Sequence, residues 1–510
     1  MLETESRQQT ETTKEELVKS VVKALLSKNF LVDEKIISQV QQKINDSEIP
    51  EGMMKEGTNQ NVFVSTIVNE ILYPRKETSF ADLDEETIHL CSIPTSIEVL
   101  YPYLKKPKKA DVPNFVQYFK KRYEGIKQIL STRPDLSAMT SISRIKSKTD
   151  KEQISLVGMI SEKAETKNGN IILTVEDPTG EIKVLLGKDK KEVKEIGDDL
   201  VLDDIIGVKG QSTGEIVFAN SVFLPEIPQT KEYKKCPDEI YACFLSDIHI
   251  GSKQFLKDNF EKFLRWIRGE AGDESQKEIA ARIKYIFIAG DLVDGVGIYP
   301  GQEKDLDVKD IFEQYKLCFN YLDKIPKDKT IIVSVGNHDA GRMSEPQPPL
   351  NEKFRSGADF SNFVFVNNPG TVKIHKSEKF EGFTCLLYHG YSFDYYVANV
   401  NSIRNNGGYD RADLIMKFLL QRRHLAPSYT STLYNIDNLE DPLIIRDLPD
   451  FFITGHIHKT AVSNYKNITM VSGSTWQDKT EFQEKLGHKP EPCRVPIVNL
   501  NTRDIKIIRF

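Results

Sequence analysis

The chain has 510 residues, of which 39% are hydrophobic and 28% charged, and its formal net charge is −6. This length predicts about three globular domains, and the slight negative charge excludes a uniformly basic surface, so any nucleic-acid contact must come from local patches. No apolar run approaches the roughly 18–20 residues that a membrane-spanning helix needs, and the acidic start Met1–Glu5 lacks the apolar core of a secretion signal. Six scattered cysteines without a CxxC pair favour a reducing environment without structural zinc. We therefore expect a cytoplasmic protein with no membrane segment.

Residues 1–75 have the pattern of a small helical domain. Apolar residues at helical spacing predict three short amphipathic helices, which begin near Thr13, Asp33 and Asn61. Such a bundle is either a self-contained domain or a docking module for a partner, and the residues favour neither reading over the other.

Residues 76–138 have the composition of a linker that contains one helix. Prolines are scattered through its first part, and the basic run Lys105–Lys109 is either a solvated tether or a phosphate contact. Apolar residues at helical spacing then predict a helix from Val112 to Leu130, which breaks at Arg133-Pro134.

Residues 139–228 change to a pattern of short strands. Five runs with strand character lie within about 85 residues, and Asp177-Pro-Thr-Gly180 between two of them is a tight-turn signal. This spacing predicts a small closed β-barrel of the OB type. Because the strands offer almost no exposed aromatic residues for stacking on bases, we expect the barrel chiefly to position the next domain.

Residues 237–510 repeat one pattern five times: a short apolar run, typical of a buried strand, ends in polar residues that can bind metals, beside a glycine. The runs and their polar residues are Ala242–Leu245 with Asp247 and His249, Tyr285–Ala289 with Asp291, Thr330–Val335 with Asn337 and His338, Thr384–Tyr388 with His389, and Phe451–Thr454 with His456 and His458. Ligands of an open α/β sheet bind outside the carboxyl ends of its strands. We therefore expect all five clusters to meet at one site.

The side chains of these clusters suit a pair of divalent cations. Two such ions about 3.5–4 Å apart form the usual clamp for attack on a phosphodiester, and the carboxylate that they share would be that of Asp291. One ion would take Asp247, His249 and His458, and the other Asn337, His389 and His456. Mixed nitrogen and oxygen ligands without cysteine favour Mn²⁺, with iron, nickel or zinc as alternatives.

His338 directly follows a predicted ligand, so we expect its ring to face the substrate. It would stabilise the transition state or protonate the leaving oxygen. Asp294 lies three residues beyond Asp291, and we expect its carboxylate to orient the His338 ring.

The order Asp-x-His, Gly-Asp, Gly-Asn-His-Asp, His-Gly, Gly-His-x-His resembles the calcineurin-like metallophosphoesterases. The resemblance implies an α/β domain with a two-sheet β-sandwich flanked by helices. It also implies seven metal ligands at Asp247, His249, Asp291, Asn337, His389, His456 and His458, with His338 as the catalytic histidine. The form Gly290-Asp-Leu-Val-Asp294 resembles the phosphatase branch, in which the second aspartate pairs with that histidine.

Four further segments are similar to the small-subunit family of the archaeal family-D DNA polymerases. They are Asp291–Gln302, Glu345–Leu350, Arg422–Pro427 and Ser472–Gln477. The resemblance covers about residues 140–510. It implies 3′–5′ exonuclease activity on single-stranded or frayed 3′ ends of DNA, and a large polymerising subunit as partner in a heterodimer or larger assembly.

Two alternatives to a proofreading subunit remain, namely a stand-alone phosphodiesterase or phosphatase and a non-catalytic polymerase scaffold. The complete ligand set argues against the scaffold, and the barrel and N-terminal helices argue against a minimal phosphatase.

Basic and aromatic residues near the predicted ligands are candidates for DNA contacts, because they could hold a frayed 3′ end. They are Tyr299, Arg342, Tyr391, Arg422, Arg423, His424 and Trp476. Packing or ion pairing is the alternative role for each. The proline-rich segment at 346–349 is either a rigid edge of the site or only a stiff loop.

Overall fold

A computed structural model of the chain describes residues 17–24, 37–38, 40–42, 44, 95–102 and 111–510, apart from 137, 149–150, 437–439, 481–482 and 485–488. Contacts divide the chain into two compact units, residues 1–89 and 90–510. In the first unit, residues 17–24 are helical, and Leu17 and Val21 are buried on one face, as the sequence pattern predicts. The predicted helix that begins near Asn61 and the basic run Lys105–Lys109 lie outside the described residues.

The predicted linker contains a strand that the sequence analysis missed. Strand β1 (Ile97–Leu100) pairs antiparallel with β11 (Gly370–Ile374), so this part of the predicted linker belongs to a sheet. Its four residues are too few to show an alternating pattern, and its partner lies more than 250 residues further along the chain. Helix α5 (Val112–Ser131) confirms the predicted helix of this segment; Asp111 caps it by accepting a hydrogen bond from Asn114 N–H.

The predicted five-stranded barrel is present and closed. Its strands pair in the order β2-β3-β4-β6-β5. They are β2 (Glu152–Glu165), β3 (Ile171–Asp177), β4 (Gly180–Leu186), β5 (Ile205–Ser212) and β6 (Ile216–Phe223). Helices α6 (Ile142–Lys146) and α7 (Lys191–Asp199) pack against it, and one apolar cluster fills the interior.

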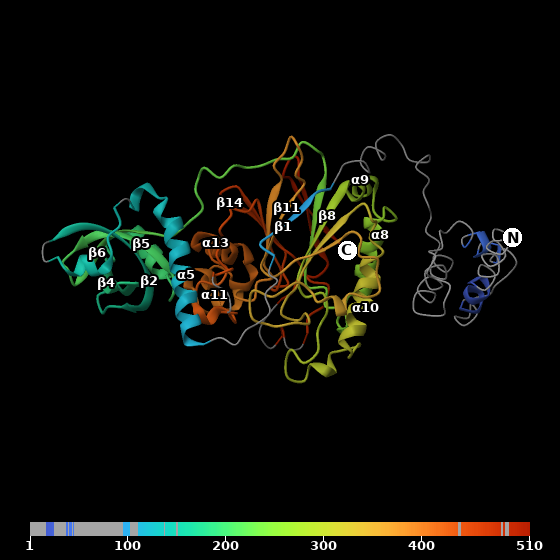
Figure 1. Cartoon of the computed structure of the whole chain (residues 1–510), viewed down its shortest axis with the longest axis horizontal. Coiled ribbons are helices and arrows are strands. Elements are labelled where there is room, and N and C mark those ends of the chain that lie inside the picture. Colours follow the sequence, from blue (N-terminus) through green and yellow to red (C-terminus); the bar gives the residue numbers. More distant parts are fainter. Residues whose placement is uncertain are drawn as a thin grey trace, which may run out of the picture. The chain divides into compact units, whose positions relative to one another are not determined.

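The remaining strands form two six-stranded sheets (Figure 1). The first has the order β10-β9-β8-β7-β16-β17 and the second β1-β11-β12-β13-β15-β14. The strands of the first sheet are β7 (Tyr241–Leu245), β8 (Ile283–Ala289), β9 (Thr330–Ser334), β10 (Phe363–Phe365), β16 (Arg494–Asn499) and β17 (Ile505–Arg509). The second sheet adds β12 (Phe383–Leu387), β13 (Phe451–Thr454), β14 (Ala461–Tyr465) and β15 (Ile468–Ser472) to β1 and β11. Strands β7 to β10 run parallel, as do β12, β13 and β15.

The sheets pack face to face, and helices cover their outer faces. Phe244 of β7 stacks on Phe287 within the first sheet and contacts Phe451 of the second. The first sheet is covered by α8 (Lys257–Ile267), α9 (Glu274–Arg282) and α10 (Ile311–Leu322), and the second by α11 (Phe393–Asn399), α12 (Asn401–Asn405) and α13 (Ala412–Arg422). This four-layer arrangement confirms the predicted two-sheet sandwich flanked by helices, preceded by the OB barrel.

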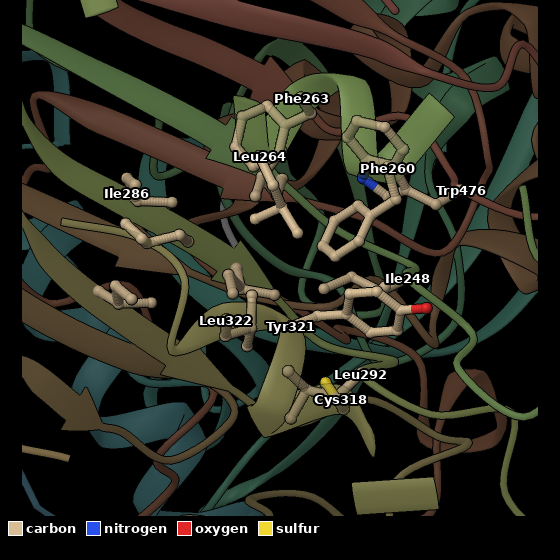
Figure 2. Packing of buried hydrophobic residues seen from close by; sticks show 14 of the residues in the cluster. Ile248, Phe260, Phe263, Leu264, Ile286, Leu292, Cys318, Tyr321, Leu322 and Trp476 are labelled. Carbon is tan, nitrogen blue, oxygen red and sulfur yellow. The ribbon is translucent and has the colours of Figure 1, made fainter. Parts of the chain in front are cut away.

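The core between the first sheet and its helices (Figure 2) includes Ile248 and Leu292, which are next to Asp247 and Asp291 in the sequence. Trp476 is 2% exposed; its ring packs edge-on against Phe260, with centroids 4.8 Å apart, and lies tilted against Phe263 at 5.5 Å. Its backbone N–H donates to the carbonyl of Asp247. Trp476 therefore belongs to the core, and the prediction that it contacts DNA was wrong.

Candidate metal centre

The five predicted clusters lie together at the carboxyl ends of strands from both sheets. Asp247 and His249 follow β7, Asp291 follows β8, Asn337 follows β9, His389 follows β12, and His456 and His458 follow β13. The two sheets face each other, so the ends of their parallel strands open on the same region.

A first group of donor atoms surrounds His249 Nε2. This atom lies 3.1 Å from His458 Nε2 and 3.8 Å from Asp291 Oδ2, while His458 Nε2 lies 3.4 Å from Asp247 Oδ1. Donors bound to one transition-metal ion at about 2.1 Å lie roughly 3 Å apart. These separations therefore fit one cation.

A second group surrounds Asn337 Oδ1. This oxygen lies 3.0 Å from His389 Nε2 and 3.1 Å from His456 Nδ1. His389 Nε2 also lies 3.2 Å from Asp291 Oδ2, the same oxygen that approaches the first group. Asp291 is thus the carboxylate placed between the two groups.

Each of the four histidines has its other ring nitrogen held from outside the centre. His249 Nδ1 is 3.1 Å from Asp294 Oδ1, and His389 Nδ1 is 2.8 Å from the carbonyl of Ala289. His456 Nε2 is 3.1 Å from Asp394 Oδ2, and His458 Nδ1 is 3.0 Å from Gln483 Nε2. Outer partners of this kind fix the ring orientation of metal-binding histidines. The sequence analysis did not predict Asp394 and Gln483. A histidine that binds a metal generally has an outer partner, but the sequence does not show which residue that partner is.

The electrostatics of the centre favour positive charge. Burial raises the pKa of the Asp291 carboxyl, but the charges of His389 and His338 outweigh it and hold the pKa well below its ordinary value. Burial lowers the pKa of His389, but Asp291 and Asp247 overcome this and raise it to about 10. Two fully buried carboxylates, each within 3.4 Å of an imidazole nitrogen, form a donor set that fits divalent cations.

The backbone around the centre is held in an unusual conformation. Asp247, His249, Asp291, His456 and His458 all have positive φ, between 50° and 69°. Non-glycine residues adopt this region rarely and at a cost of about 1–3 kcal/mol each, typically at functional sites. Gly336 allows a close approach, because a Cβ there would lie 2.2 Å from Asp291 Oδ1.

His338 and Asp294 are close together, but their predicted relation was wrong. His338 Nδ1 lies 2.7 Å from the backbone carbonyl of Asp294, not from its carboxylate. The carboxylate instead contacts His249 and accepts from Gln302 Nε2 and Gln477 Nε2. Asp294 therefore orients His338 through its main chain and His249 through its side chain.

A pocket of about 280 Å³ opens over the centre. His338 and two predicted DNA contacts, Tyr299 and Tyr391, line it; Met343 and Tyr409 also line it and were not predicted. Arg342 is partly buried, and its guanidinium donates to the carbonyl of Pro346. It holds the following segment in place and is not among the residues that line the pocket.

The three consecutive residues Arg422, Arg423 and His424 are buried and paired, so their prediction as DNA contacts was wrong. Arg422 Nε forms an ion pair with Asp204 of the barrel at 2.9 Å. Arg423 donates to the carbonyls of Ile445 and Arg446, and His424 Nε2 lies 2.8 Å from Asp441 Oδ2. This segment joins the barrel to the sandwich.

Comparison with known families agrees with this architecture. A model described as calcineurin-like phosphoesterase matches residues 242–460, and one described as an OB-fold nucleic acid binding domain matches residues 154–213. The chain thus carries a calcineurin-like phosphoesterase domain that follows an OB-fold domain.

Three curated relatives define the family more closely, and each is named DNA polymerase II small subunit. The relative from Methanocaldococcus jannaschii is 41% identical over 76% of this chain and 64% of its own length. Those from Methanothermobacter thermautotrophicus and Archaeoglobus fulgidus are 37% and 38% identical, over 78% and 77% of this chain and 80% and 76% of their own lengths. The chain belongs to the family of archaeal DNA polymerase II small subunits, which confirms the resemblance seen in the sequence. None of the helices in the described part of the chain has the length and apolar character needed to cross a membrane.

Proposed function

We propose that the chain is the 3′–5′ exonuclease subunit of a two-subunit DNA polymerase and removes nucleotides from DNA 3′ ends with two bound cations. The observation that carries the proposal is the convergence of seven donor side chains from five strand ends into two groups that share Asp291. Cations held in this way stabilise charge on phosphate oxygens and activate water for attack. The nitrogen and oxygen donors suit Mn²⁺, with iron, nickel or zinc as alternatives.

The chain's own residues would divide the work between the two groups. Asp247, His249 and His458 would hold one cation, and Asn337, His389 and His456 the other. Asp294, Asp394 and the Ala289 carbonyl keep one nitrogen of their histidine occupied, so that the other nitrogen points to a cation.

His338 is the candidate for proton transfer. A carbonyl oxygen only accepts hydrogen bonds, so the contact with Asp294 requires a proton on His338 Nδ1. This leaves Nε2 for the substrate, and it would donate to the leaving 3′ oxygen from the imidazolium form, in which both ring nitrogens carry protons. The ring also meets that of His249 edge to face at 4.7 Å, which limits its rotation.

The pocket over the centre suggests how a DNA end would be held. Tyr299 and Tyr391 offer aromatic faces to a base or sugar. The residues that line the pocket in the described part of the chain include neither lysine nor arginine. We therefore assign the neutralisation of the scissile phosphate to the cations and His338.

The relatives' name, small subunit, supports a large polymerising subunit as the partner of this chain. The fixed barrel supports the same assignment, since a stand-alone phosphatase does not require an OB domain tied to the sandwich by a buried ion pair.

The test is trimming of a 5′-labelled primer with a mismatched 3′ end, by the full chain with Mn²⁺, alone and with its co-purified large subunit. We expect stepwise shortening from the 3′ end, and a loss of about 10²- to 10⁴-fold in His338→Ala. Asp291→Ala should be inactive. Hydrolysis of a phosphomonoester without any DNA trimming would favour the phosphatase, and no hydrolysis at all would favour the scaffold.

A further inference from the structure

The proline-rich segment Glu345–Leu350 contains two buried polar residues, Glu345 at 1% and Gln347 at 4% exposed. Gln347 faces Asn368, which is 1% exposed, through two backbone hydrogen bonds. Gln347 N–H donates to the Asn368 carbonyl at 2.7 Å, and Asn368 N–H donates to the Gln347 carbonyl at 3.0 Å. The segment is therefore fixed to the connection that runs from β10 to β11, where the chain crosses from one sheet to the other.

The side chains of these two residues extend the contact to the loops that carry Asn337 and His389, both from the second group of donors. Gln347 Nε2 donates to the carbonyls of Gly336 at 3.1 Å and Arg342 at 3.0 Å. Asn368 Nδ2 donates to Gln347 Oε1 at 2.7 Å, and Asn368 Oδ1 accepts from the backbone N–H of His389 at 2.9 Å.

Only one arrangement of the two amides satisfies this chain of hydrogen bonds. Gly336 and Arg342 present carbonyl oxygens, which accept only, so Gln347 must turn its NH₂ group to them. Its oxygen then faces Asn368, which must donate, and the oxygen of Asn368 is left for His389 N–H. Every link has one donor and one acceptor, so the network specifies its own geometry.

The network joins the two sheets where their ligands meet. Gly336 precedes Asn337 on the first sheet, and its N–H is held by Asp339 Oδ2 at 2.8 Å. His389 follows β12 on the second sheet. Asn337 Oδ1 and His389 Nε2 lie only 3.0 Å apart. The Gln347–Asn368 pair holds the backbone beside both ligands, at the carbonyl of Gly336 and at the N–H of His389.

We propose that Gln347 and Asn368 are positioning residues for the cation that Asn337 and His389 would bind. They touch no ligand side chain and act by fixing the separation of two loops from different sheets. This inference rests on the proposed two-cation site. It also gives the proline-rich segment a role other than the edge of the pocket.

The test is Mn²⁺ binding by the full chain, measured by titration calorimetry and by electron paramagnetic resonance of the bound ions. Gln347→Met removes the three side-chain hydrogen bonds at similar length and without a charge. We expect one of the two Mn²⁺ sites to weaken by about 10- to 100-fold, the usual effect of removing an outer partner, and the spin coupling of the ion pair to be lost. The other site should keep its affinity.

Gln347→Glu provides a second variant of the same shape. By charge alone it would strengthen cation binding, whereas loss of the two donors to Gly336 and Arg342 would weaken it. Weaker Mn²⁺ binding by Gln347→Glu would therefore show that the hydrogen bonds of Gln347 matter more than the charge at this position.

Asn362→Leu is the matched control. Asn362 is 9% exposed and donates to the Lys329 carbonyl at 2.8 Å, beside the amino ends of β9 and β10 and so at the opposite end of the sheet. We expect it to lower the melting temperature and leave both Mn²⁺ affinities unchanged.

The outcomes separate this inference from the proposed function. If the wild-type chain does not bind two Mn²⁺ ions, the proposed site itself fails. If it does, and both Gln347 variants bind two ions with wild-type affinity, the positioning role is overturned. If a variant melts like the control but loses one site, the role stands.

Discussion

Two clusters of buried carboxylates and histidines lie in the second unit of this chain, and they differ in what balances their charge. Around Asp441, the guanidinium of Arg122 donates at 2.6 Å and His424 lies at 2.8 Å, with all three side chains at most 2% exposed. Burial lowers the pKa of His424 to about 4, so arginine alone supplies the positive charge. Around Asp291 the neighbours are histidines, and the pKa of His389 rises to about 10.

The comparison shows that burial of acids with histidines does not by itself mark a metal site. The Asp441 cluster already holds a permanent cation, because Arg122 donates to Asp441 and to the Pro427 carbonyl. The Asp291 cluster consists of donors aimed at common points and opens on a pocket. The first cluster fastens α5 to the sandwich, and the second is the proposed cation site.

The largest expected effect comes from Asp291→Asn, which removes the shared carboxylate at constant shape. Both Mn²⁺ sites should be lost and the rate of 3′-end trimming should fall by about 10³-fold or more, since metal stabilisation of the transition state is worth several kcal/mol. His458→Ala and His456→Ala should each remove one site only. Calorimetric stoichiometry distinguishes these cases, and full retention of two ions in Asp291→Asn would contradict the shared role.

Arg122→Met should destabilise the fold without touching the cations. It leaves Asp441 as a buried carboxylate without its arginine, a change that costs about 3–5 kcal/mol. Denaturant unfolding measures this loss, and Mn²⁺ affinity should stay at the wild-type value. A loss below about 1 kcal/mol would mean that the Asp441 cluster is not the completed ion pair described above.

The pH dependence of stability tests His424 directly. Its pKa is about 4 in the fold and about 6.5 in the unfolded chain. The unfolded state therefore binds the proton first, and the stabilisation by neutral His424 is complete above pH 6.5 and falls as the pH drops towards 4. Between pH 7 and pH 4 the free energy of unfolding of the wild type should fall by about 3 kcal/mol more than that of His424→Gln. Parallel stability curves for the two proteins over this range would refute the shift.

The smallest effect is expected at the pocket wall. Tyr391→Ala should weaken binding of a single-stranded 3′ end by about 1–3 kcal/mol, the usual contribution of stacking on a base. Arg422→Met is the control, because it removes the buried pair with Asp204 and should leave this affinity unchanged. Fluorescence anisotropy with a labelled oligonucleotide compares the two. If Arg422→Met weakened oligonucleotide binding and Tyr391→Ala did not, Arg422 would be a DNA contact after all.

The sequence predicted elements whose signal is local. The apolar runs before Asp247, Asp291 and Asn337 became β7, β8 and β9, and the barrel strands and α5 appeared where expected. Each apolar run is long enough to indicate a buried strand. The polar residues that follow it directly must then lie at the carboxyl end of that strand.

The sequence could not show what depends on distant partners. Arg422 and His424 look like a basic motif until Asp204 and Asp441 are found beside them. The carboxylate of Asp294 was assigned to the wrong histidine, because the turn that presents its carbonyl to His338 is not visible in the sequence. Strand β1 was missed for the same reason, since only β11 makes it a strand.

The central claim is that seven side chains from two sheets hold two cations that share one aspartate. A crystal structure with Mn²⁺, with anomalous scattering recorded at the manganese edge, tests it most directly. The account predicts two peaks about 3.5–4 Å apart on either side of the Asp291 carboxylate, one at His249 and His458 and the other at Asn337 and His389. A single peak, or peaks that do not touch Asp291, would contradict it.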